Sequence, residues 1–187
     1  MRKLLALIGV GALAVGLSAC GSSGTSGTEV LTGSLTGAPA ASILNSSGNP
    51  ALRLSTLTFS GPVDTSVSNI PLGGGGTGPA FSTPDGNFAV SHKTKKPGPA
   101  QPTLTGKTGN TCHFTWLLAS GTYIVNGSKS TGKFAGATGH GTYTVSIVAS
   151  ANLLPGKTTC SSNNTGNVLA QGAAINFKAS GPLTLKS

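Results

Sequence analysis

Short β-favouring runs separated by turn-forming residues dominate the chain after residue 20. The clearest run, residues 142–149, alternates side chains: Tyr143, Val145, Ile147 and Ala149 fall on one face, and Thr142, Thr144 and Ser146 fall on the other. This alternation predicts a half-buried antiparallel strand. Similar runs bounded by Gly, Pro or Asn predict further strands at 114–119, 122–125, 173–179 and 183–186.

Neither helical periodicity nor charge favours a helical fold. No window after residue 20 carries a capped apolar stripe at helical spacing. Charged residues make up 8% of the chain. The usual fraction is about 25%, so a bundle held by Glu–Lys pairs is excluded. We therefore predict an all-β fold, either a single antiparallel sandwich or a small β-barrel, that follows an N-terminal signal helix.

Turn-forming residues concentrate in three stretches, 71–80, 91–103 and 155–167. They lead us to predict a single β-rich domain over 29–187, in which the part before residue 104 is more irregular and 104–187 is the core. Leu52, Leu54, Leu57 and Phe59 alternate with a one-residue slip at 55–56, which predicts a β-bulge there.

The first 20 residues have the pattern of an export signal. Arg2 and Lys3 precede an apolar run at 4–17, which is too short for a bilayer-spanning helix of about 20 residues. The run ends in Leu17-Ser18-Ala19-Cys20-Gly21, which resembles the lipobox of bacterial lipoproteins. The resemblance implies that 1–19 is a lipoprotein signal peptide and that Cys20 becomes the mature N-terminus and carries a diacylglycerol. The alternative is an ordinary secretory signal with an incidental cysteine.

The lipobox resemblance also bears on compartment and on the other cysteines. It implies a lipid-anchored, extracytoplasmic protein in the cell membrane or outer membrane, with 20–28 as a flexible tether. If Cys20 is lipidated, Cys112 and Cys160 remain as a pair in an oxidising compartment, and we predict a disulfide that staples 104–187. A metal or redox role is the less favoured alternative, because neither has a second cysteine within two to four residues.

The charge balance points to anionic partners at an envelope. Loss of Arg2 and Lys3 with the signal would lower the net charge from +9 to +7, and no Asp or Glu follows Asp85. Only Lys93, Lys95 and Lys96 cluster, and export removes nucleic acid as a partner. Beside the lipid bilayer that holds the anchor, we expect weak attraction to anionic envelope polymers, glycans or lipid headgroups.

No motif predicts a catalytic, cofactor-binding or metal-ligating residue. Gly73, Gly75 and Gly78 have dinucleotide-loop spacing but lack the following helix, and 127–133 begins like a phosphate-binding loop but ends in Phe134, so it predicts a turn. His92, His113 and His140 match no compact metal pattern. The three acids, Glu29, Asp64 and Asp85, are too few for a paired-carboxylate hydrolase.

The segments 121–125 and 131–143 resemble the central signature of the allene oxide cyclase and dirigent barrels, in which a strand leads into a Gly-rich corner. The resemblance implies a barrel with Phe134 plugging its end, but it transfers no catalytic residue, because the acids of dirigent-type sites have no counterpart after Asp85. Backbone geometry separately leads us to expect Gly136 and Gly139 at positive φ.

Two functions remain open from the sequence. The first is a non-enzymatic, lipid-anchored structural or binding module of the envelope. The alternative is a small β-barrel that binds an apolar ligand or catalyses a cyclisation or isomerisation. An open apolar interior cavity above roughly 300 Å³ would favour the alternative, and an interior filled by side chains would favour the first.

Overall fold

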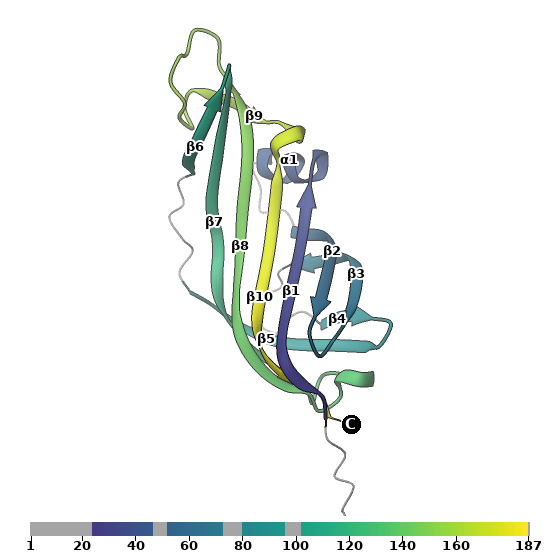
Figure 1. Cartoon of the computed structure of the whole chain (residues 1–187). Coiled ribbons are helices and arrows are strands. Elements are labelled where there is room, and N and C mark those ends of the chain that lie inside the picture. The colour runs from purple at the N-terminus through teal and green to yellow at the C-terminus, as the bar shows by residue number, and fades with distance from the viewer. Residues whose placement is uncertain (1–23, 47–51, 73–79, 96–101, 187) are drawn as a thin grey trace, which may run out of the picture.

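The computed structural model describes residues 24–46, 52–72, 80–95 and 102–186, which form one curved antiparallel sheet and little helix (Figure 1). The strands are β1 Ser26–Thr36, β2 Leu52–Ser60, β3 Thr65–Leu72, β4 Ala80–Thr83, β5 Gly86–Lys95, β6 Thr103–Thr108, β7 Thr111–Val125, β8 Thr138–Leu153, β9 Thr165–Val168 and β10 Ala174–Thr184. The helices are α1 Ala38–Asn45 and two 3₁₀ turns, Gly132–Phe134 and Ala170–Gly172.

The strand order brings the sheet nearly back on itself. The order is β3-β2-β1-β10-β8-β7-β5-β4, with β6 added to β7 and β9 added to β8. The two end strands, β3 and β4, contact each other. In Figure 1, β2 to β5 gather around the lower end, and α1, β6 and β9 lie at the upper end. The all-β prediction is confirmed, and of its two alternatives the architecture is the small barrel.

The alternation of residues 142–149 is confirmed in β8. Val145, Ile147 and Ala149 are buried, whereas Thr142 and Thr144 are exposed. The predicted pieces 114–119 and 122–125 form one strand, β7, with a register shift between Leu117 and Ala119. The pieces 173–179 and 183–186 likewise join in β10, because glycines inside these strands pair with their neighbours instead of ending the strand.

The part before residue 104, which we predicted to be more irregular than the rest, contains the five strands β1 to β5. The strand β1 begins at Ser26, inside the predicted tether 20–28, because Ser26–Thr28 pair with Pro182–Thr184 of β10. The domain therefore begins before residue 29.

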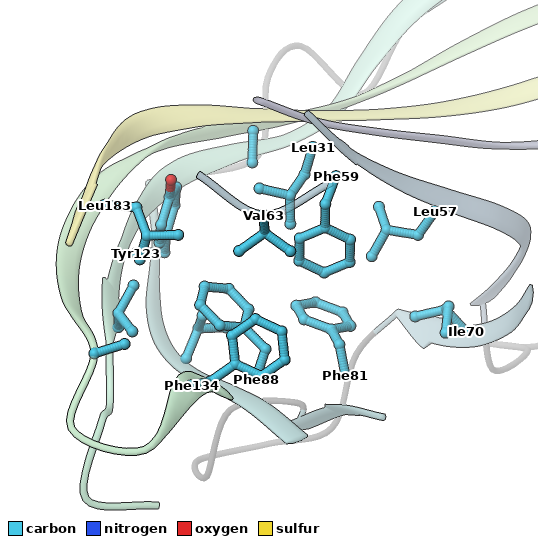
Figure 2. Close-up of a cluster of buried hydrophobic side chains, with 14 of the residues drawn as sticks. Leu31, Leu57, Phe59, Val63, Ile70, Phe81, Phe88, Tyr123, Phe134 and Leu183 are labelled. Atoms are coloured by element: carbon cyan, nitrogen blue, oxygen red, sulfur yellow. The ribbon is translucent and has the colours of Figure 1, made fainter. Parts of the chain in front are cut away.

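The largest buried cluster fills the closed end of the barrel (Figure 2). It contains Leu31, Leu54, Leu57, Phe59, Val63, Ile70, Phe81, Phe88, Val90, Tyr123, Val125, Phe134, Ala137, Ala179 and Leu183. Because most of these residues precede residue 104, the segment 104–187 is not a core by itself. A second cluster, around Ile147 and Ile175, is covered by Ala40 and Ala41 of α1.

The predicted bulge at 55–56 has a different form. The β2–β3 register is the same on both sides of the irregularity, but the pairing omits Ser55 and Asn69. Asn69 has φ 55°, and Arg53 Nη1 donates to its Oδ1 at 2.9 Å. Each strand therefore changes its inward face at a matched position, so that both Leu54 and Leu57 are buried. A bulge would have added a residue to one strand only.

The helix α1 was not predicted from the sequence. It has eight residues, begins after Gly37 at φ 73° and has Pro39 in its first turn, without a side-chain cap. About two turns are too few to show a helical stripe. Its formation depends on the burial of Ala40 and Ala41 against the sheet.

The Gly-rich corner between β7 and β8 closes the barrel. Phe134 is 1% exposed, and its ring centroid lies 5.3 Å from that of Phe88, so it plugs the lower end as expected. Gly136 has φ 72°, as expected, but Gly139 does not have positive φ. Gly139 is required for a different reason, because a Cβ there would lie 2.5 Å from the carbonyl oxygen of Pro182.

Adding a methyl group at Gly136 or at Gly139 should lower the stability of the fold, for a different reason at each position. We predict that Gly136→Ala costs about 1–2 kcal/mol through left-handed backbone strain. Gly139→Ala should cost a similar amount, because its methyl group would collide with β10. Thermal unfolding checks both. The matched control is Gly166→Ala in β9, where the nearest atom is 3.8 Å from the added Cβ. Equal small shifts at all three positions would contradict this account.

Candidate functional site

Two of the predicted motifs lie outside the described residues. These are Cys20, with the signal segment, and the glycines Gly73, Gly75 and Gly78. None of the helices in the described part of the chain is long and apolar enough to cross a membrane.

The predicted disulfide between Cys112 and Cys160 is confirmed. Their Cα atoms are 5.7 Å apart, and 48 residues separate them in the sequence. Cys112 is fully buried beside Phe114 and Ala151. The bridge therefore ties the connection between β8 and β9 to the upper end of β7.

The segment 127–133 is a turn followed by the start of a 3₁₀ turn, as predicted. Its backbone docks on the β4–β5 hairpin: the Thr131 amide donates to Asn87 O at 2.9 Å, and the Lys133 amide donates to Asp85 O at 2.9 Å. The Lys133 ammonium pairs with the Asp85 carboxylate at 2.6 Å. The residues that resemble a phosphate loop therefore serve to close the barrel end.

The three histidines lie on different strands, β5, β7 and β8. His113 Nδ1 lies 2.8 Å from Ser150 Oγ, and the His92 ring packs edge-on against Tyr143 at 5.9 Å. Across the described ranges, no three His, Cys, Asp or Glu side chains group closely enough to hold a metal ion.

The closed end of the barrel is packed with aromatic rings (Figure 2). Phe59 meets Phe88 edge-on at a centroid distance of 5.7 Å and Phe81 at 6.2 Å. Edge-on pairs at these distances are favourable contacts. The interior of this end is thus occupied by the protein's own side chains.

A buried carboxyl, Glu29 on β1, is the functional group that the sequence reasoning missed. Its side chain is 1% exposed, and its Oε2 accepts a hydrogen bond from the Val63 amide at 2.8 Å. Its Oε1 has no hydrogen-bond partner among the described residues. The available signal was the spacing of Glu29, Leu31 and Leu35, which places all three on the inward face of one strand.

Glycines make room for Tyr123 on the inner face beside Glu29. Glu29 pairs with Gly181, and Tyr123 pairs with Gly141. A Cβ at Gly181 would lie 2.7 Å from the Gly141 Cα, and one at Gly141 would lie 2.6 Å from the Tyr123 ring. The Tyr123 ring therefore lies over Gly141, on the side of the sheet that Glu29 also faces.

Burial perturbs both groups in the same direction. Desolvation raises the pKa of Glu29, and the nearby Asp64 charge raises it further, against the lowering effect of backbone hydrogen bonds at Val63 and Ser60. Desolvation also raises the pKa of Tyr123, and the Glu29 charge adds to that rise. Burial therefore favours the protonated form of both side chains.

The outward face of the sheet carries three adjacent rows of side chains that cross the strands, which together we call the hydroxyl face. The first, the lysine row, consists of Lys95, Ser120, Thr144, Lys178, Thr32, Thr58 and Ser66. On one side of it lie Lys93, Thr122, Thr142, Ser180, Val30 and Ser60, and on the other side lie Leu117, Ser146, Asn176, Ser34, Thr56 and Ser68. Most of these side chains are exposed or half-buried hydroxyls.

A shallow surface hollow of about 560 Å³ lies beyond the lower edge of this face. Its lining includes Ser91, Ile124, Asn126, Ser128, Thr138 and Lys186. Ile124 is 63% exposed and neighbours Thr122 of the hydroxyl face. The hollow is therefore on the outside of the barrel and is not the interior cavity that the second functional alternative requires.

Breaking the disulfide should destabilise the fold substantially. Chain entropy predicts a loss of about 4 kcal/mol for a closed loop of this length. We therefore expect reductant to lower the urea midpoint of the wild-type protein and of Cys20→Ser, which retains the bridge. Reductant should leave Cys160→Ala unchanged, and a reductant effect in that variant would contradict the assignment.

Glu29 should make stability fall with rising pH. Because its folded-state pKa is raised, its contribution is fully present below the ordinary carboxyl pKa and is lost as pH rises through the folded value. We expect Glu29→Gln to raise the melting temperature at pH 7 by a few degrees. The difference between the two proteins should shrink at acidic pH.

The control for this prediction is Asp64→Asn, which removes the like charge that raises the pKa of Glu29. In that background the titration of the stability difference should move to lower pH. A pH-independent difference between wild type and Glu29→Gln would refute the assignment of the titration to Glu29.

Comparison of the chain with family models, curated proteins and solved structures found no match.

Proposed function

We propose that the protein is an exported module, anchored through a lipid on Cys20, that binds a component of the bacterial envelope through its outer surface. The single observation that carries this proposal is the contrast between the two sheet faces. The inward face is packed with apolar side chains, and the outward face displays rows of hydroxyls.

The placement of the acids supports a role other than catalysis. Glu29 is buried in the barrel, Asp85 pairs with Lys133, and Asp64 lies exposed between β2 and β3. An acid–base pair would need two titratable groups facing a common substrate. The three carboxyls of the chain do not offer that arrangement.

The second candidate, a barrel acting on an apolar ligand, has one observation in its favour. Glu29 offers an unpartnered carboxyl oxygen inside the barrel, near Tyr123. A ligand would reach it only by displacing packed side chains of the closed end. The test is mass spectrometry of the small molecules that the purified protein releases on denaturation. A stoichiometric apolar compound among them would favour this second candidate.

The anchor and the binding role can be tested with one variant. We predict that Cys20→Ser abolishes incorporation of labelled fatty acid and leaves the protein soluble after cell fractionation in high salt. The soluble variant should still sediment with isolated envelopes at low ionic strength, because the substitution at Cys20 leaves the outward face of the sheet unchanged. Retention of the variant in salt-washed membranes, or failure to sediment with envelopes, counts against the proposal.

A further inference from the structure

We propose that the lysine row is a binding surface for an anionic polysaccharide whose chain lies across the strands. This inference rests on the proposed function, and it names the partner class and the surface. All seven members of the row are lysines or hydroxyl residues, and each is paired with the next across the sheet. Such a row is a continuous track of polar groups over seven strands.

The row places its charges at a defined separation. Lys95 and Lys178 are three strands apart, or roughly 14 Å at the ordinary strand spacing. Lys93 stands two residues from Lys95 on β5, roughly 7 Å along the strand. All three ammonium groups are on exposed residues. A polymer with regularly spaced carboxylates or phosphates can meet such charges, and an isolated small anion cannot meet them all.

The hydroxyls between the lysines are available for a ligand. Among the described residues, two side chains of the lysine row are hydrogen-bonded to each other: the hydroxyls of Thr58 and Ser66, which lie 3.5 Å apart. The hydroxyls of Ser120, Thr144 and Thr32 make no side-chain hydrogen bond there. Each can donate and accept, which matches the hydroxyl groups of a sugar.

Charge complementarity selects an anionic chain. None of the three carboxylates of the protein lies in the hydroxyl face: Glu29 points inward, and Asp64 and Asp85 lie between strands. The face therefore presents positive charge without local neutralisation. Neighbouring lysines attract an anionic partner additively, and salt screens that attraction.

The shape of the sheet favours a flexible chain over a flat membrane. The hydroxyl face is the outer side of a sheet that curves around its core (Figure 1), so a plane can touch only part of it. The lysine row has no apolar side chain to insert between lipids. A polysaccharide can follow the curvature and use the hydroxyls as well as the lysines.

The test measures binding of full-chain Cys20→Ser protein to polygalacturonate by calorimetry at low ionic strength, with dextran as the uncharged control. The test variant adds Lys95→Gln and Lys178→Gln. The matched control adds Lys129→Gln and Lys157→Gln, which remove the same charge from exposed turns outside the face. A third variant adds Thr144→Val, which removes a hydroxyl and keeps the side-chain shape.

We expect the row variant to bind polygalacturonate about tenfold more weakly and the control variant to be nearly unaffected. Thr144→Val should weaken binding by a smaller factor. Equal losses in the row and control variants would overturn the assigned surface. Undiminished binding by Thr144→Val would reduce the interaction to charge alone and overturn the polysaccharide assignment.

Binding of the same proteins to vesicles that contain phosphatidylglycerol tests whether the partner is an anionic lipid surface instead. Tighter binding to these vesicles than to polygalacturonate, lost in the row variant, would overturn the choice of a polysaccharide. If all variants still sediment with envelopes, the proposed function stands and this inference fails. If the parent protein does not sediment, the proposed function fails independently of the lysine row.

Discussion

A single antiparallel sheet with one apolar face must cover that face, and this constraint governs the rest of the structure. The described part of the chain has too little helix to cover it, since α1 reaches only the upper part around Ile147 and Ile175. The sheet covers the lower part by curling until β3 meets β4. Phe134 fills the open end, so a residue that closes the barrel is also part of its core.

Glycine positions make this curling possible at the places where strands and rings come closest. Gly141 gives space to the Tyr123 ring, and Gly139 lets β8 approach Pro182 and Leu183 of β10. Gly86 and Gly132 face each other where the corner docks on the β4–β5 hairpin, and both have positive φ. The high glycine content therefore has a structural cause inside the strands as well as in the turns.

The sequence predicted the parts of the fold that local pattern determines. Alternation identified the two faces of β8, and cysteine counting identified the disulfide. The sequence did not predict the features that depend on contacts between distant segments. The strand β1 extends to Ser26 because β10 is there to pair with it, and α1 forms because Ala40 has a sheet to cover. The burial of Glu29 was not predicted, because glutamate side chains usually lie on the protein surface.

The same alternation explains how so few charges can produce a polar, one-signed surface. The hydroxyls of Thr144 and Ser146 in β8 lie on the outside because the neighbouring Val145 and Ile147 lie on the inside. The carboxyls are removed from that surface by burial or placement in turns, whereas Lys95 and Lys178 remain on it. The positive field of the hydroxyl face thus follows from where the acids lie, and not only from how few there are.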